Sequence, residues 1–239
     1  MLLLWHSRLW ALQAGMLALI PVLALSQGSY TTNFPFIENP ISEGGHWING
    51  AVAGVDWQNV RTISSLACGT QTGSSGKYDD STAVLTGSWG RNQTVQATVY
   101  SVNQNTNLWE EVELRLRTTI APHKITGYEI NFRCLKHESA YMEIVRWNGG
   151  LGDFTRLANY HGAQYGVADG DVVKATVIGS TIAVYINNVL MGQVSDRRAL
   201  TSGNPGIGFW LYGAGNTSNY GFSNFTATDQ VQSPTAPQP

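Results

Sequence analysis

The chain has 239 residues, of which 14 are basic and 16 are acidic, so its formal net charge is −2. Charged residues make up only 13% of the sequence and form no block of one sign. Because nucleic-acid-binding proteins normally carry a basic stripe, this composition excludes nucleic acid as a partner.

The N-terminal residues predict a secretory signal. Arg8 precedes a mostly apolar run over residues 9–25, and small residues surround the point where cleavage would occur. Gln13 and Pro21 interrupt this run, which favours removal of the segment over an uncleaved membrane anchor. We therefore expect a signal peptide over residues 1–26, a protein secreted to the extracellular space or periplasm, and no stable membrane span after processing.

Residues 27–229 are predicted to form one domain, because about 200 residues can bury a good core and no Pro/Ser-rich linker divides them. Residues 230–239 contain three prolines and are predicted to be a disordered tail. Within the domain, short runs of β-branched and aromatic residues alternate with turn residues, and no stretch has a helical period. Evenly spaced strands of this kind predict an all-β sandwich or barrel. The expected strands lie at 83–86, 95–100, 110–117, 128–134, 141–147, 154–160, 172–178, 181–186, 189–194, 206–211 and 220–227.

Three of these strands, at 110–117, 128–134 and 141–147, alternate apolar and polar residues with a period of two. A strand places alternate residues on opposite faces, so each set of residues shares one face of a sheet. The apolar set, which we expect in the core, is Val112, Leu114, Leu116, Ile130, Phe132, Met142 and Ile144. The other set is Glu111, Glu113, Arg115, Arg117, Glu129, Asn131, Arg133, Tyr141, Glu143 and Trp147.

This second face suits a sugar. Aromatic rings stack on the apolar C–H faces of sugars, while carboxylates, amides and guanidinium groups bind sugar hydroxyls. We therefore expect Arg115, Arg117, Asn131, Arg133, Tyr141, Glu143 and Trp147 to bind the ligand. Six tryptophans are candidates for stacking, although most of them are expected in the core: Trp47, Trp57, Trp89, Trp109, Trp147 and Trp210. Trp147 is favoured because it shares the face, with Trp57 second.

Paired carboxylates on this face also allow catalysis. Glu111 and Glu113 lie two residues apart on one strand, about 6.6 Å along the backbone. That spacing suits the carboxylate pair of a glycosidase, and Glu129 or Glu143 is as well placed as Glu111 to partner Glu113. We take Glu113 and Glu129 as the candidate catalytic pair. The alternative is structural, with the glutamates and arginines forming a cross-strand ionic ladder.

Two further features are expected to be structural. Cys68 and Cys134 are the only cysteines, and in an exported chain they are expected to form a disulfide, with two buried reduced thiols as the alternative. No motif requires a cofactor. A structural calcium ion is possible, either at the acidic segment 77–81, which otherwise reads as a polar turn, or between Asp229 and the N-terminal acids Glu38 and Glu43.

The second half of the chain resembles a known family. Residues 170–179, 182–187, 203–209 and 220–227 read as a strand, a strand ending in an asparagine turn, a glycine-rich strand and an aromatic closing strand. This pattern resembles the closing half of concanavalin A-like lectin/glucanase (laminin G-like) domains. It is also similar to secreted bacterial domains of the 3-keto-disaccharide hydrolase type. The resemblance implies a jelly-roll sandwich of two antiparallel sheets with a concave surface that often faces carbohydrate.

The resemblance does not carry catalytic roles over to this chain. The glucanase pattern Glu-x-Asp-x-x-Glu fails, because Leu114, Arg115 and Leu116 follow Glu113. Related lyases use arginine to neutralise an acidic sugar, and Arg115, Arg117 and Arg133 would suit that role, but the lyase signatures are absent. Because this fold hosts many activities, three functions stay open. The first is a secreted protein that binds an oligosaccharide or polysaccharide on the concave sheet. The others are a glycoside hydrolase using paired glutamates and a non-catalytic protein-interaction module.

Overall fold

The computed structural model describes residues 28–54, 56–74 and 78–229. The predicted signal peptide and C-terminal tail lie outside these residues. Within them the chain forms fifteen β-strands and one short 3-10 turn, Ala163–Tyr165, and none of its helical structure is long and apolar enough to cross a membrane. The all-β class predicted from the sequence is confirmed.

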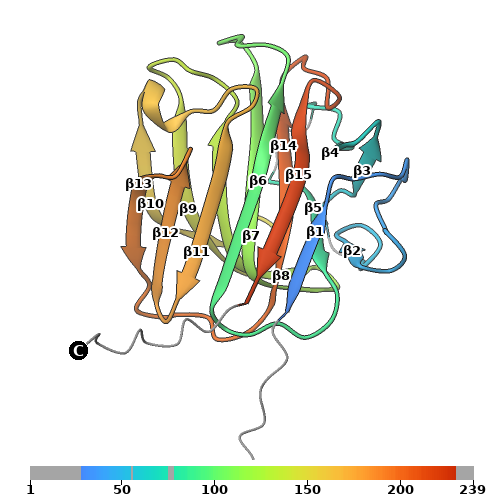
Figure 1. Ribbon diagram of the computed structural model, residues 1–239, viewed down its shortest axis with the longest axis vertical. Helices are drawn as coiled ribbons and strands as arrows, with labels where there is room; N and C mark the ends of the chain where they lie inside the picture. The colour runs from blue at the N-terminus through green and yellow to red at the C-terminus, as the bar shows by residue number, and fades with distance from the viewer. Residues whose placement is uncertain (1–27, 55, 75–77, 230–239) are drawn as a thin grey trace, which may run out of the picture.

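The strands form two antiparallel sheets that pack face to face as a sandwich (Figure 1). The first sheet runs in the order β13 (Val189–Ser195), β12 (Thr181–Ile186), β11 (Val172–Ile178), β6 (Gln93–Ser101), β15 (Tyr220–Thr228), β4 (Leu66–Gly69) and β3 (Val60–Ile63), and β1 (Ser29–Thr32) also pairs with β15. The second sheet runs in the order β10 (Phe154–His161), β9 (Tyr141–Gly149), β8 (Lys124–Arg133), β7 (Trp109–Ala121), β14 (Asn204–Tyr212), β5 (Ser81–Leu85) and β2 (Trp47–Asn49). The predicted jelly-roll sandwich is confirmed.

The alternation of β7, β8 and β9 places the expected apolar residues between the two sheets. The register pairs Val112 with Phe132, and it pairs Ile130 with both Leu114 and Ile144. All seven predicted core residues of these strands are fully buried in one cluster with residues of the first sheet. The period-two pattern therefore assigned the inner and outer faces of the second sheet correctly over most of its length.

A β-bulge in β7 breaks that pattern at Arg117. The register with β8 shifts between Leu116 and Thr119, and Arg117 adopts a positive φ of 47°. Gly127 lies opposite the bulge, and only glycine fits there, because an added Cβ would lie 2.4 Å from Thr118 Oγ1. The extra residue of a bulge reverses the side that the following side chain faces. Arg117 consequently leaves the expected ligand-binding face.

The guanidinium of Arg117 is instead held by the backbone of two loops. It donates hydrogen bonds to the carbonyls of Arg91 and Leu200, each 2.5 Å long, and its side chain is buried. Its own backbone N–H donates to Gln93 Oε1 at 2.8 Å. These contacts fix the edge of the sandwich and correct the prediction that Arg117 shares a face with Arg115.

The predicted disulfide is absent, and both cysteines are free and buried. Cys134 packs in the core between the sheets, whereas Cys68 pairs in register with Arg61 and lies outside the core cluster that contains its neighbour Ala67. Adjacent residues of a strand face opposite sides, so the two thiols lie on different sides of the first sheet. Burial raises the pKa of both thiols, which makes them poor nucleophiles. Of the two sequence-based alternatives, the reduced pair is the one observed.

Parts of two connections lie over the outer face of the second sheet. The connection from β2 to β3 leaves the edge of this sheet, and the ring centroid of its Trp57 lies 5.2 Å from that of Trp147 on β9. The connection from β4 to β5 comes from the first sheet, and the ring centroid of its Tyr78 lies 5.0 Å from that of Phe154 on β10. These segments cover part of the outer face.

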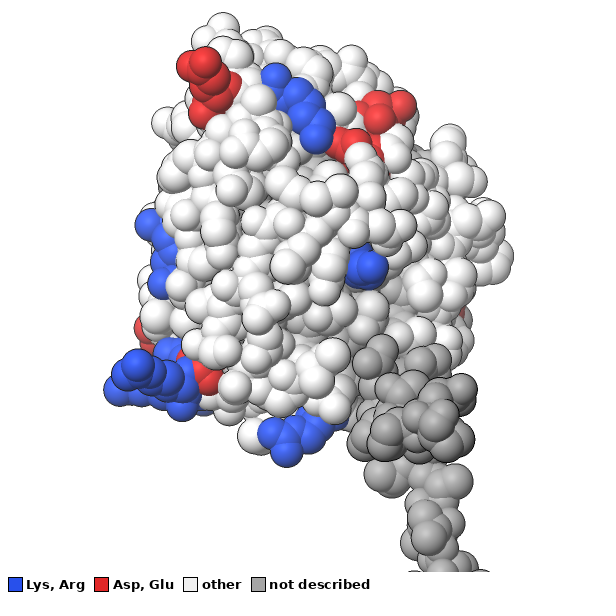
Figure 2. Space-filling view, turned by 60° about the vertical axis from the view of Figure 1, so that its left-hand side comes forward, with Lys and Arg blue, Asp and Glu red and all other residues white. Residues whose placement is uncertain are grey.

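The surface carries few charges. In Figure 2, charged side chains gather mainly toward the top and bottom of the face shown, and most of that face is uncharged. This agrees with the low content of charged residues in the sequence, 13%. Several of the charged residues that the chain does contain lie buried against the outer face of the second sheet.

Candidate functional site

The covered part of the outer face is a small second core. Trp57, Ile125, Val145 and Trp147 form this cluster, and the two tryptophans pack edge to face, with 1% and 2% of their surfaces exposed. Trp147 Nε1 donates a 2.6 Å hydrogen bond to Glu129 Oε2. Trp147 and Trp57 were the two favoured stacking residues. Trp147 lies on the outer face that its alternation predicted, but Trp57, from the connection between β2 and β3, packs against it and covers its ring.

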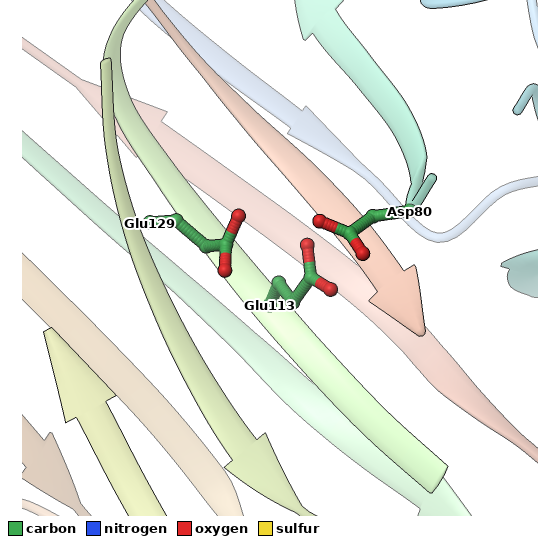
Figure 3. A group of neighbouring side chains, drawn as sticks. All are labelled: Asp80, Glu113 and Glu129. Atoms are coloured by element: carbon green, nitrogen blue, oxygen red, sulfur yellow. The ribbon is translucent and has the colours of Figure 1, made fainter. Parts of the chain in front are cut away.

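Next to this cluster lies a buried group of three carboxylates around one arginine. Asp80, Glu113 and Glu129 come from residues 70–80, from β7 and from β8, and their carboxyl groups point toward one another (Figure 3). Arg115 Nη2 lies 2.6 Å from Glu113 Oε2 and 3.3 Å from Asp80 Oδ2. Its Nη1 lies 2.9 Å from Glu129 Oε2. For Glu113, Arg115 and Glu129 the structure thus shows the ionic ladder that was the alternative to a catalytic pair.

The same three carboxylates have the donor atoms of a metal site. One oxygen of each lies within 4.8 Å of the others. However, the guanidinium of Arg115 already reaches all three and supplies the positive charge that a cation would bring. A hard cation such as Ca²⁺ needs six or more oxygen ligands at close range, which a buried guanidinium among them prevents. The residues do not fit a metal ion.

Burial changes the protonation of this group. It raises the pKa of Asp80 well above its ordinary value, as does the neighbouring charge of Glu129, and Arg115 only partly opposes these effects. Burial and the charges of Asp80 and Glu129 likewise raise the pKa of Glu113. Burial by itself lowers the pKa of Arg115, but the three carboxylates outweigh it and keep the guanidinium charged. One arginine cannot balance three buried negative charges, so burial favours the protonated forms of Asp80 and Glu113.

Gly208 provides the space for this group. It faces β7 from β14 in register with Glu113, and a Cβ added there would lie 2.1 Å from Glu113 Oε2 and 2.8 Å from Arg115 Nε. Any side chain at position 208 would therefore displace the ion pair.

We predict that Gly208→Ala destabilises the protein by about 1–3 kcal/mol, the usual cost of overpacking. Urea denaturation monitored by tryptophan fluorescence measures this free energy of unfolding. Gly150→Ala is the control, since an added Cβ there meets no atom within 4 Å. Equal stability of the two variants would show that the group tolerates displacement.

Beyond this group lies an open pocket of about 360 Å³. Six of its lining residues are aromatic rings: Tyr78, Trp109, Tyr141, Trp147, Phe154 and Trp210. Four others are acids: Asp80, Glu111, Glu129 and Glu143. The remainder are Asn131, Ser139, Val145, Arg156 and His161. The pocket is concave and mostly apolar with a few convergent polar groups, which is typical of small-ligand sites.

Glu111 and Glu143 form the acidic part of the pocket wall. Glu111 accepts a short hydrogen bond from the hydroxyl of Tyr141, and burial raises its pKa well above the ordinary value. Glu143 Oε2 pairs with Arg156 Nε at 3.0 Å, and burial raises the pKa of Glu143 also, against the opposing effect of Arg156. Each of these carboxylates therefore already has one partner from the protein.

Arg133 supports the pocket from behind. Its two terminal nitrogens donate hydrogen bonds to the carbonyls of Thr106, Leu108 and Ser139, at 2.8, 2.9 and 3.0 Å. Its guanidinium carbon lies 3.9 Å from the centroid of the Trp109 ring. This stacking orients Trp109, which is 37% exposed, at the rim of the pocket. Arg133 thus positions an aromatic wall, and its side chain does not line the pocket.

The predicted site residues fall into those that line the pocket and those that are buried away from it. Glu129, Asn131, Tyr141, Glu143 and Trp147 line the pocket, as does Glu111. Glu113 and Arg115 lie in the buried group next to it, and Arg117 and Arg133 bind loop carbonyls. The sequence reasoning did not single out Phe154, Arg156, Ser139 or His161. Phe154, Arg156 and His161 lie on β10, whose sequence lacks a clean alternation, so no pattern pointed to them.

The acids proposed for calcium bind protein groups. Glu43 accepts hydrogen bonds from Tyr30, Thr32 and Trp47, and Glu38 accepts two from backbone N–H groups. Asp229 accepts from the backbone N–H groups of Gly28 and Gly90, at 2.5 and 2.6 Å. Asp229 thereby ties the end of β15 to the start of the domain. A structural calcium ion stays a prediction.

Comparison with known proteins adds to this picture. No known family model matches the sequence, and no curated protein matches it. Among solved structures, the κ-carrageenase from Pseudoalteromonas carrageenovora, in complex with an oligotetrasaccharide of κ-carrageenan, superposes with a TM-score of 0.55. The match is 10% identical and covers 90% of this chain and 100% of that one. The chain has the concanavalin A-like jelly-roll fold.

Two further structures with this fold support the assignment. β-Agarase A in complex with oligoagarose has a TM-score of 0.53 at 10% identity, covering 85% of this chain and 94% of that one. The exoplasmic domain of VIP36, bound to Ca²⁺ and Man3GlcNAc, has a TM-score of 0.52 at 11% identity, covering 79% and 85%. At these identities the similarity establishes the concanavalin A-like fold, which hosts both enzymes and lectins. The activity has to be inferred from the residues of the site.

Proposed function

We propose that this concanavalin A-like protein binds a neutral glycan in the pocket on the outer face of its second sheet. The observation that carries the proposal is the combination of exposed or half-exposed rings with polar groups around one cavity. Trp109 and Tyr141 lie 6.1 Å apart between ring centroids, on the side of the pocket next to Glu111. Flat rings of this kind stack on sugar C–H faces while the adjacent polar atoms bind hydroxyls.

The charges around the pocket favour an uncharged sugar. The three arginines that would have suited an acidic sugar are buried with other partners, which leaves Arg156 as the lining arginine. Four acids line the same pocket. A uronate or sulfated sugar would therefore place its charge beside these acids, with Arg156 already paired with Glu143, which costs affinity, whereas the hydroxyls of a neutral sugar can hydrogen-bond to their carboxyl groups.

The partners of the carboxylates favour binding over cleavage. Glycosidases need one carboxylic acid and one carboxylate flanking the scissile bond. Glu113 and Glu129, the pair considered from the sequence, are both tied to Arg115, and Glu143 is tied to Arg156. A carboxylate that is paired with arginine is a weaker base and nucleophile, so a binding protein accounts for this arrangement more simply.

One observation favours hydrolysis as a second candidate. Glu111 lies in the pocket wall, and burial raises its pKa well above the ordinary value, the direction expected of a general acid. In that case Glu111 would protonate the leaving oxygen, and a second group would have to act from the other side of the sugar. The exported location that the predicted signal peptide implies suits both candidates.

The deciding experiment is a screen of the mature chain against immobilised neutral and uronate-containing glycans, reading retention and release of new reducing ends together. We expect retention of a neutral glycan without release, and retention of uronates at least about tenfold weaker. Release that disappears in Glu111→Gln would establish the hydrolase instead. If the protein shows no retention and no release, both candidates are contradicted and a protein-interaction module is favoured.

A further inference from the structure

We infer that the pocket receives the end of a glycan chain and excludes chain interiors, an inference that rests on the proposed function. A site for a chain interior must be open on two sides, so that the chain can enter and leave. Along the sheet, this pocket is closed at the side that Tyr78 and Phe154 line and open at the side that Trp109 lines.

The closed side is an aromatic wall. Tyr78, carried by residues 70–80, reaches Phe154 across the sheet, and Phe154 in turn lies 5.4 Å from Trp147 between ring centroids. All three residues line the pocket. Tyr78 precedes β5 and Phe154 lies on the edge strand β10, so their contact bridges the strands between them on this side of the pocket.

Among the described residues, the outer face behind this wall is filled by the small core of Trp57, Ile125, Val145 and Trp147, all buried. Beside this core, Asp56 in the connection from β2 to β3 pairs at 2.9 Å with His123 Nδ1, in the turn between β7 and β8. A chain that continued past Phe154 would have to displace packed tryptophans.

The opposite side of the pocket is exposed. Trp109, Ser139 and His161 line it and are all exposed to solvent. A ligand can therefore continue outward past Trp109, whose ring Arg133 holds in place. A cavity of about 360 Å³ also has room for roughly one or two sugar rings, less than a chain segment that passes through would need.

The test compares intact and shortened glycans. Neutral polysaccharides (a glucan, a galactan, a mannan and a fructan) are each used as soluble competitors, intact and after partial acid hydrolysis, against the immobilised glycan that retains the protein best. Hydrolysis multiplies chain ends while the mass of sugar stays constant. We expect competition per unit mass to rise with the number of ends, by about tenfold or more for short fragments.

Two results separate the inference from the function on which it rests. Binding with unchanged competition per unit mass after hydrolysis would overturn chain-end recognition and leave glycan binding standing. Binding by none of the polysaccharides or fragments would overturn the proposed function and this inference with it.

A variant tests the wall directly. Tyr78→Ala removes the half-exposed ring on the solvent side of this wall, so a chain could leave there above the buried core, and the advantage of fragments over intact polysaccharide should shrink severalfold. Tyr185→Ala is the matched control, because Tyr185 lies on β12 of the other sheet, beside Lys174, and should keep the full advantage. A full advantage in Tyr78→Ala would show that this wall does not exclude chain interiors.

Discussion

Replacing Arg115 with methionine is expected to destabilise the protein by about 3–5 kcal/mol, the usual cost of removing one partner from a buried ionic group. Arg115 is fully buried and is the charged partner that Asp80, Glu113 and Glu129 share. Methionine fills a similar volume but leaves the carboxylates without a counter-charge. Urea denaturation at neutral pH measures the loss of unfolding free energy.

The pH dependence of this loss distinguishes charge from packing. Burial raises the folded-state pKa of Asp80 and Glu113, so the folded protein holds protons that the unfolded chain releases. Stability contributed in this way is present at low pH and is lost as pH rises toward the folded-state pKa. Without Arg115 these pKa values rise further. The variant should therefore lose clearly less stability at about pH 5 than at about pH 8.

Arg156→Met is the matched control for this prediction. Arg156 pairs with Glu143, but its side chain is half exposed, so water screens the interaction. We expect this substitution to change stability by less than about 1 kcal/mol. A loss in Arg115→Met that is equally small, or that does not depend on pH, would show that the buried carboxylates are neutral without the arginine.

Trp109→Ala is expected to give the largest loss of glycan affinity of any single substitution, an increase in Kd of about 10- to 100-fold, or about 1.4–2.8 kcal/mol. The ring of Trp109 forms the exposed wall of the pocket and packs on the guanidinium of Arg133. Alanine removes the stacking surface and leaves Arg133 to move. Titration calorimetry with the glycan that the protein retains measures the change.

Two controls accompany this substitution. Phe36→Ala removes an exposed ring that does not line the pocket and should leave Kd unchanged. Trp109→Phe keeps an aromatic ring over Arg133 and should recover part of the affinity. If Trp109→Ala binds as tightly as the parent protein, the aromatic pocket is not the glycan site.

The sequence predicted much of the fold because its strongest signal is local. Alternation in β7, β8 and β9 depends only on neighbouring residues, so it identified the seven core residues of these strands and the polar face opposite them. The same signal predicted the pocket residues Glu129, Asn131, Tyr141 and Glu143. It failed at Arg117, where one extra residue in a bulge turns the side chain to the other face of the sheet. The pattern of residue types in the sequence does not predict such a bulge.

The sequence by itself therefore determined the all-β class, the core of the second sheet and a polar, aromatic outer face. The tertiary structure decided which part of that face stays open. Trp57, from the connection between β2 and β3, buries Trp147, and the residues just before β5 bring Asp80 to Arg115, while Trp109 stays at the rim. It also separated Cys68 from Cys134. These outcomes depend on contacts between residues far apart in the chain, which local periodicity cannot encode.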